Sequence, residues 1–136
     1  MVKALIGGLL AASVVLGAHA YRRYLSSERE IRAAADAMRT AGPRLDTEGC
    51  VTEALAFGKR CGAIANMCEE AVAPLVRTCL MGQDRGAYCR AIGPRASDTH
   101  FTFARCRERG RSRRDHNCAE AYLAVVAHCR EPGRTP

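Results

Sequence analysis

The chain has 136 residues, a formal net charge of +7, eight cysteines, three phenylalanines, four tyrosines and no tryptophan. A short chain with so few aromatic residues buries limited apolar area, so disulfides would matter for its stability. The sequence has no Cys-X-X-Cys pair, which argues against a zinc ribbon and a thioredoxin-like redox motif. The even number of cysteines instead favours structural disulfides, which persist in an oxidising compartment.

Residues 1–24 have the pattern of a signal peptide or of a single transmembrane anchor. Lys3 precedes an uncharged run, and Ala18-His19-Ala20 has the form of a cleavage site, with cleavage after Ala20. The run of about eighteen residues is also at the short end of a membrane-spanning helix. If it is retained, the residues expected at the membrane interface are Tyr21, Arg22, Arg23 and Tyr24.

The distribution of basic residues leaves both interpretations open. Four arginines follow the apolar run and outnumber Lys3, which precedes it. They are Arg22, Arg23, Arg29 and Arg32. In an anchored chain this excess favours a cytoplasmic body, whereas an oxidised cysteine domain requires the opposite side. Cleavage would remove this conflict, and under either interpretation we expect a non-cytosolic body.

Residues 25–45 are predicted to form a linker or stalk helix. Ser27 and Glu30 have the spacing of a capping box, which predicts a helix from about Glu28 to Ala41. The Gly42-Pro43 pair would end this helix.

Two helices, over about residues 47–60 and 67–81, are expected next. Side chains that can cap their N-termini stand at suitable places: Asp46 or Thr47, and a capping box of Asn66 and Glu69. Pro74 lies inside the second helix and should kink it or split it in two.

Cysteine spacing predicts that these two helices form a stapled hairpin over about residues 46–82. In two antiparallel helices, residues whose sequence numbers add up to the same value lie side by side. The sums 50+79 and 61+68 are both 129. We therefore expect the disulfides Cys50–Cys79 and Cys61–Cys68.

A second, less regular hairpin is predicted over about residues 84–131. Its expected helices are Asp84–Ile92, a helix from a Ser97 or Asp98 cap to Arg109, and a helix from an Asn117-Glu120 capping box to about Arg130. Of the many connectivities that eight cysteines allow, Cys106–Cys118 as an inner pair and Cys89–Cys129 as an outer pair fit this hairpin.

The predicted fold class is all-α. No segment shows the period-two alternation of a strand. The expected architecture is an N-terminal hydrophobic helix, a linker helix, and two disulfide-stapled helical hairpins in a cysteine-rich domain of residues 46–133.

The paired cysteines resemble those of the coiled-coil-helix-coiled-coil-helix (twin CX9C) proteins of the mitochondrial intermembrane space. The matching positions are Cys50, Cys61, Cys68 and Cys79, followed by Cys89, Cys106, Cys118 and Cys129. Family members enclose nine residues between paired cysteines, whereas three gaps of this chain enclose ten. The resemblance implies oxidative folding and a role as an accessory subunit or assembly factor of a membrane complex, without catalysis.

Other chemistry has less support in the sequence. Thiolates can bind Cu(I), and His116 and His128 lie close in sequence to Cys118 and Cys129, but the sulfurs are three helical turns apart rather than on successive turns. No nucleophile motif, zinc-protease motif, phosphate loop or pair of catalytic carboxylates is present. We therefore predict no catalytic, cofactor-binding or metal-ligating residues.

A cluster of basic residues is the most distinctive predicted surface. It consists of Arg105, Arg107, Arg109, Arg111, Arg113 and Arg114. It is either a solvated helix end and turn or a docking surface for an acidic protein or anionic lipid. Nucleic acid is disfavoured because no aromatic residues alternate with the arginines.

These observations favour a non-enzymatic accessory or scaffold subunit of a membrane-associated complex, on the non-cytosolic face. Its expected partners are the membrane, through the N-terminal helix if retained, and protein subunits of the complex. One alternative is a secreted or periplasmic binding or effector module, and another is a thiol-based copper-binding protein. The family resemblance adds the mitochondrial intermembrane space as an alternative location.

Overall fold

The computed structural model describes residues 2–93, 99–112 and 114–131, with side chains from residue 7 onward. These residues form six α-helices and a short 3-10 turn, with no β-strand among them, so the predicted all-α fold class is confirmed. The elements are α1 (Val2–Ala41), η1 (Gly42–Arg44), α2 (Thr47–Arg60), α3 (Ala65–Leu80), α4 (Gly86–Ile92), α5 (Thr99–Glu108) and α6 (His116–Arg130).

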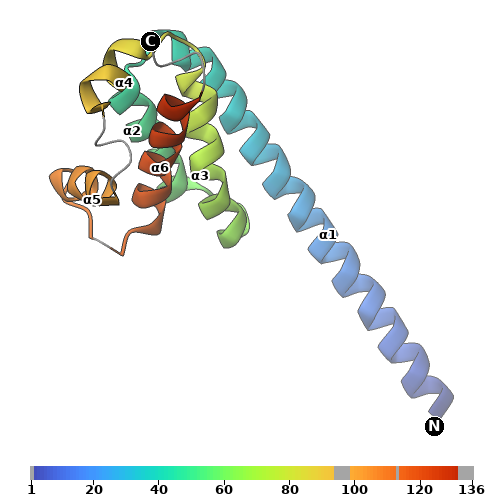
Figure 1. Ribbon diagram of the computed structural model, residues 1–136. Coiled ribbons are helices and arrows are strands. Elements are labelled where there is room, and N and C mark those ends of the chain that lie inside the picture. Colours follow the sequence, from blue (N-terminus) through green and yellow to red (C-terminus); the bar gives the residue numbers. More distant parts are fainter. Residues whose placement is uncertain (1, 94–98, 113, 132–136) are drawn as a thin grey trace.

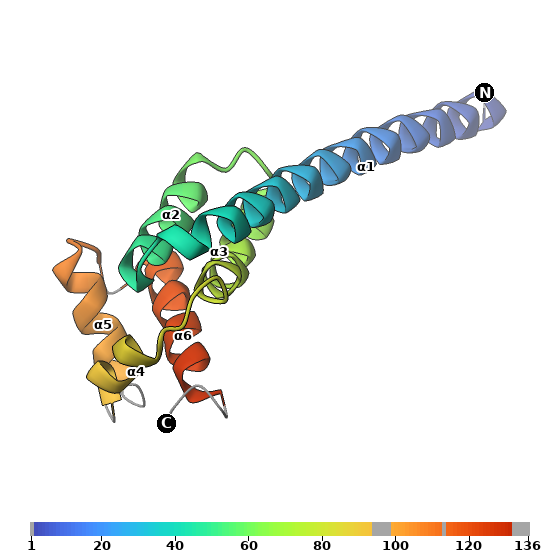
Figure 2. The same ribbon diagram turned by 90° about the horizontal axis from the view of Figure 1, so that it is seen from above.

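Helix α1 is a continuous rod whose N-terminal part projects away from the other helices, as Figure 1 and Figure 2 show. Its C-terminal part packs against α3. The prediction of a separate helix starting at Glu28 is wrong, because residues 18–41 contain neither glycine nor proline to interrupt the helix. The Ser27 hydroxyl donates to the Arg23 carbonyl, 2.9 Å away, as it does inside a continuous helix.

The hydrophobic core lies among α2, α3, α6 and the C-terminal part of α1. Helix α3 packs against α1, α2 and α6. Its apolar positions recur at helical spacing, so that Val72, Val76 and Leu80 are fully buried on one side. Each such side chain stabilises the fold by about 1.5–3 kcal/mol relative to exposure to water.

The helix N-termini confirm one predicted cap and correct two others. Asp46 caps α2, since its carboxylate accepts from the Gly49 amide at 2.6 Å. Helix α3 starts before the predicted Asn66 box, and the Ile64 amide at its N-cap donates to the Ser27 hydroxyl of α1 at 3.1 Å. Asp115 rather than Asn117 caps α6, accepting from the Cys118 amide at 3.1 Å.

Pro74 does not split α3, which runs unbroken from Ala65 to Leu80. The proline lies on the exposed side of the helix. Water can therefore solvate the carbonyl that loses its intrahelical partner.

Four disulfides join the helices, and they are the same four pairs that cysteine spacing predicts. They are Cys50–Cys79, Cys61–Cys68, Cys89–Cys129 and Cys106–Cys118, with Cα–Cα distances of 5.7, 5.9, 5.2 and 5.9 Å. The first two lie at opposite ends of the α2–α3 hairpin, as the constant sum requires.

The second half of the body is less compact than a simple hairpin. Helix α6 packs mainly against α3 and α2, while α5 lies on the outer side of α6. Helix α4 is linked covalently to the end of α6 through Cys89–Cys129. The predicted cap at Ser97 or Asp98 lies outside the described residues.

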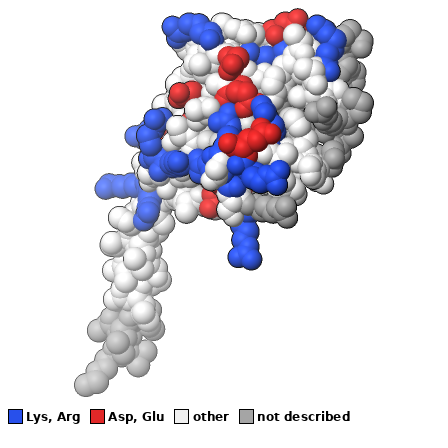
Figure 3. Space-filling model, turned by 90° about the vertical axis from the view of Figure 1, so that its left-hand side faces the viewer, with Lys and Arg blue, Asp and Glu red and all other residues white. Residues whose placement is uncertain are grey.

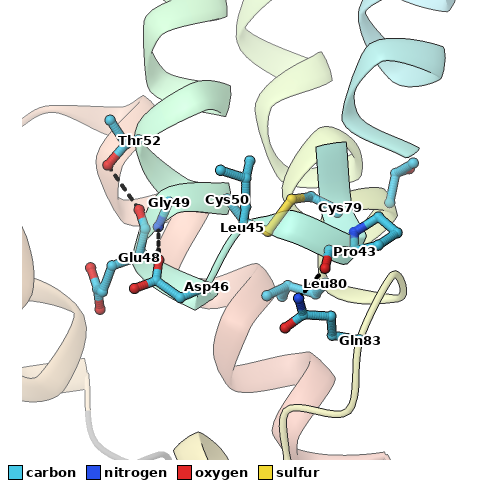
Figure 4. The surroundings of a disulfide bond; sticks show 12 residues. Pro43, Leu45, Asp46, Glu48, Gly49, Cys50, Thr52, Cys79, Leu80 and Gln83 are labelled. Carbon is cyan, nitrogen blue, oxygen red and sulfur yellow. Dashed lines mark hydrogen bonds between the residues drawn. A yellow bond between two sulfur atoms is a disulfide. The ribbon is translucent and has the colours of Figure 1, made fainter. Parts of the chain in front are cut away.

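Close backbone packing surrounds the Cys50–Cys79 disulfide (Figure 4). A Cβ atom on Gly42 would lie 2.5 Å from the Cys79 carbonyl oxygen, and one on Gly82 would lie 2.6 Å from the Gly42 carbonyl carbon. Only glycine therefore fits at these two positions without a backbone shift. The buried Arg85 guanidinium completes the packing by donating to the Leu45 and Gly42 carbonyls, at 2.7 and 3.1 Å.

Candidate functional site

A charged cluster centred on Glu48 connects four helices. The Glu48 carboxylate, in the first turn of α2, accepts from the Tyr122 hydroxyl of α6 at 2.6 Å and from the Tyr88 hydroxyl of α4 at 2.9 Å. It also pairs with Arg109 at 2.6 Å and with Arg105. Arg105 belongs to α5, and Arg109 directly follows it. We call these five residues the Glu48 cluster.

The ionisation of this cluster is fixed at neutral pH. Burial alone would raise the pKa of Glu48, but hydrogen bonds from Tyr122, Arg109, Arg105 and Tyr88 outweigh it and lower that pKa to about 2. Burial and the hydrogen bond to Glu48 raise the pKa of Tyr122 to about 12, and burial with the nearby Glu48 charge raises that of Tyr88. The low pKa makes the Glu48 carboxylate a weak base, and both phenols stay protonated near pH 7. The cluster can hold helices together, and that is the chemistry its geometry supports.

Packing around Tyr122 reinforces the cluster. The Arg105 and Arg109 guanidinium carbons lie 5.9 and 5.7 Å from the centroid of the Tyr122 ring. The Phe101 ring meets the same ring edge to face, with centroids 6.2 Å apart. Such contacts add to the ion pairs because the tyrosine ring is almost completely buried.

The predicted basic cluster divides into inward and outward members. Arg105 and Arg109 contact Glu48, and Arg111 pairs with Asp115 at 3.0 Å. Arg107 and Arg114 are exposed. Arg113 lies outside the described residues. The five described arginines therefore do not form one continuous surface, and Figure 3 shows acidic side chains among the basic ones on this side of the body.

A cavity of about 510 Å³ lies between α4 and α5, beside the Glu48 cluster. Its lining mixes apolar side chains with the polar or charged groups of Tyr88, His100, Arg105 and Glu108. Arg105 is already engaged there, since it pairs with Glu48 and, at 2.7 Å, with Glu108. Arg105 and Glu108 are therefore both already paired with protein groups.

The projecting part of α1 is the other distinctive surface. Every side chain from residue 7 to residue 24 is exposed. The large apolar ones among them are 64–72% exposed: Leu9, Leu10, Val14, Val15 and Leu16. Contact with the body begins only at Leu25 and Ser27. Among the described residues, no helix combines the length and apolar character that crossing a membrane requires.

All eight cysteines are engaged in disulfides, so no thiol is free to bind a metal. Over the described ranges, no group of three or more histidine, cysteine, aspartate or glutamate side chains could hold a metal ion. His116 and His128 belong to α6, and His128 is buried there.

Comparisons with known proteins give no further guide to function. No protein-family model matches the chain, and no curated protein or solved structure is found to match it.

Sequence reasoning missed Glu48, although it singled out two of its partners as arginines of the basic cluster. An acidic residue in the first turn of a helix is explained locally by the helix dipole. Its partners Arg105 and Arg109 lie 57 and 61 positions further along the chain, so no local pattern connects them.

Proposed function

We propose that this protein is a non-enzymatic accessory or scaffold subunit of a membrane-associated complex, on the non-cytosolic face of the membrane. The observation that carries the proposal is the exposed apolar part of α1, which projects from a disulfide-stapled body. Contiguous apolar surface of this kind marks contact with a protein or membrane partner rather than with water. The body would then present the interaction surface.

Three further features support this proposal. The four disulfides are compatible with an oxidising, non-cytosolic location. The resemblance to the twin CX9C proteins implies the same kind of accessory role, with the mitochondrial intermembrane space as the alternative location. The Glu48 cluster fits a structural role, since its groups hold fixed charges at neutral pH.

The proposal is tested on the natively isolated protein by membrane fractionation, native size measurement and intact mass. We expect co-fractionation with membranes in a complex larger than the monomer. After alkylation of free thiols, the mass should show no thiol label and should fall eight hydrogens below that of the reduced chain. A monomer found outside every membrane fraction would contradict the proposal.

A secreted or periplasmic binding module remains a second candidate, and one observation favours it. Because contact between α1 and the body starts at Leu25, cleavage after Ala20 would leave the contacts of the body in place. N-terminal sequencing separates the two candidates, since a mature chain that begins at Tyr21 supports the secreted module. Several labelled thiols in the native protein would instead support the copper-binding alternative.

A further inference from the structure

We propose that Tyr21, Arg22, Arg23, Tyr24 and Arg29 of α1 form a collar that binds anionic lipid headgroups while the preceding part of the helix enters the acyl-chain layer. This inference rests on the membrane association proposed above. It assigns the lipid chemistry to α1 rather than to the basic residues of the body.

From residue 7 to residue 18 the projecting helix carries only apolar or small side chains on all sides, with His19 just before the collar, and this favours lipid over a protein groove. Successive residues of a helix point about 100° apart, and residues 7–21 include no aspartate, glutamate, lysine or arginine. A second copy of the chain or a protein groove would cover only part of this circumference, whereas acyl chains surround a helix completely. The Ser13 hydroxyl is also satisfied inside the helix, since it donates to the Leu9 carbonyl at 2.9 Å.

The collar lies where this charge-free segment ends. Four consecutive residues, 21–24, cover all sides of the helix with two tyrosines and two arginines. Tyr21 and Tyr24 are 62% and 47% exposed, and tyrosine is typical of the boundary between acyl chains and headgroups. Arg29 lies about 10 Å along the helix axis from the centre of residues 21–24. It is therefore within one Debye length of such a boundary.

The charges of the collar are available to a ligand. Within the described residues, Arg22, Arg23 and Arg29 form no ion pair, whereas Arg32 pairs with Glu28 at 2.5 Å and Arg39 with Asp36 at 2.6 Å. Figure 3 shows basic side chains where the projecting helix joins the body, and no charged side chain along the described part of the helix beyond them.

An apolar segment followed directly by a basic collar matches an anionic bilayer better than another ligand. An acidic protein or a nucleic acid could neutralise the arginines, but it would leave the adjoining apolar segment in water. A bilayer with anionic headgroups places an apolar layer directly beside a negatively charged one, which matches both parts of α1. Contact between α1 and the body starts at Leu25 and Ser27, within about one turn of Tyr24, so the body would rest on the headgroup layer.

The test measures binding of the oxidised full chain to vesicles of phosphatidylcholine alone or mixed with phosphatidylglycerol. We expect tighter binding to the mixed vesicles. The triple variant Arg22→Gln, Arg23→Gln, Arg29→Gln should lose about a hundredfold in affinity for them, because each arginine near an anionic surface contributes about 1 kcal/mol. The matched control Arg77→Gln, Arg107→Gln, Arg114→Gln removes the same charge from exposed sites on the body and should change affinity by less than about threefold.

The outcomes separate this inference from the proposed function. Equal binding of the wild-type chain to both vesicle types would overturn the collar and leave membrane association standing. Equal weakening by the two triple variants would also overturn the collar, because a general charge effect would then explain the binding. Absence of binding to either vesicle would overturn both the collar and the membrane part of the proposed function.

Discussion

The Glu48 carboxylate connects side chains from several helices. It accepts hydrogen bonds from two tyrosines and pairs with two arginines that belong to other parts of the chain. Because the carboxylate is about one-third exposed, water screens the pairs only in part. Loss of the charge would leave Arg105 and Arg109 facing each other beside a buried ring.

The pH dependence of stability should report this residue. The pKa of Glu48 is lowered from 4.5 to about 2 in the folded state, so its ionised form stabilises the fold above pH 4.5. This contribution, up to about 3 kcal/mol, is lost as the pH falls from 4.5 towards 2. Urea unfolding of the oxidised protein, measured at neutral pH and near pH 2, should show this loss for the wild type and much less of it for Glu48→Gln.

A second acidic residue provides the control for that measurement. Glu28 pairs only with Arg32, four residues away on the surface of α1. Glu28→Gln should change stability by less than about 0.5 kcal/mol. An unchanged pH dependence in Glu48→Gln would show that other carboxylates carry the acid sensitivity.

The distinction between the inward and outward arginines could not be predicted from the sequence. Arg105, Arg107 and Arg109 alternate within one short segment, and their local surroundings are alike. Only the packing of α2 against α6 brings Glu48 close to two of them. The orientation of each arginine is thus a property of the tertiary structure.

Among the elements, α1 is held on the body by a small polar contact in addition to its packing against α3. The turn between α2 and α3 donates two backbone amides to α1. The Gly62 amide donates to the Glu30 carboxylate at 2.8 Å, and the Ile64 amide donates to the Ser27 hydroxyl at 3.1 Å. These bonds hold α1, where its contact with the body begins, against the turn that the Cys61–Cys68 disulfide closes.

Replacement of Ser27 by alanine should loosen this contact. We expect a loss of about 1 kcal/mol in stability and faster hydrogen exchange of the Ile64 amide, which loses its acceptor. Ser26→Ala is the matched control, because the Ser26 hydroxyl donates only within α1, to the Arg23 carbonyl at 2.8 Å. Equal exchange rates in the two variants would argue against a docking role for Ser27.

Ser27, Glu30 and Asp46 show why some helix starts could be predicted from the sequence and others could not. Ser27 and Glu30 have the spacing of a helix start, yet both serve a contact with a turn more than 30 residues away. Asp46, by contrast, caps α2 through an amide three residues away, a bond that the local sequence fully specifies. A local partner did not always suffice, because α6 is capped by Asp115, through an amide three residues away, rather than by the predicted Asn117.

At the scale of the whole molecule, cysteine spacing predicted more of the fold than any other sequence pattern. Equal number sums predicted the two pairs of the α2–α3 hairpin, and the inner and outer pairs chosen for the second half, whose sums are not equal, are also the ones found. The path of α6 against α3 could not be predicted, because both helices have apolar faces that fit several partners. The long unbroken α1 could not be predicted from local spacing, because Ser27 and Glu30 have the spacing of a helix start while lying inside a continuous helix.

The disulfides should differ in their contribution to stability. Cys89–Cys129 closes a loop with a sequence separation of 40 residues, whereas Cys61–Cys68 closes one of 7. Chain entropy predicts a loss of about 4 kcal/mol when the first pair is replaced by alanine and about 2.5 kcal/mol for the second. Urea unfolding without reductant measures both. A larger loss for Cys61–Cys68 would show that its role at the α1 contact outweighs loop entropy.

The positions of the four disulfides also determine the covalent topology of the chain. Every cysteine up to Cys79 pairs with another in residues 50–79, and every cysteine from Cys89 onward pairs within residues 89–129. A single peptide-bond cut at residues 81–85 would therefore leave two fragments with no covalent link between them. In denaturant they should separate without any reductant, whereas a cut between Cys89 and Cys106 should leave the pieces joined.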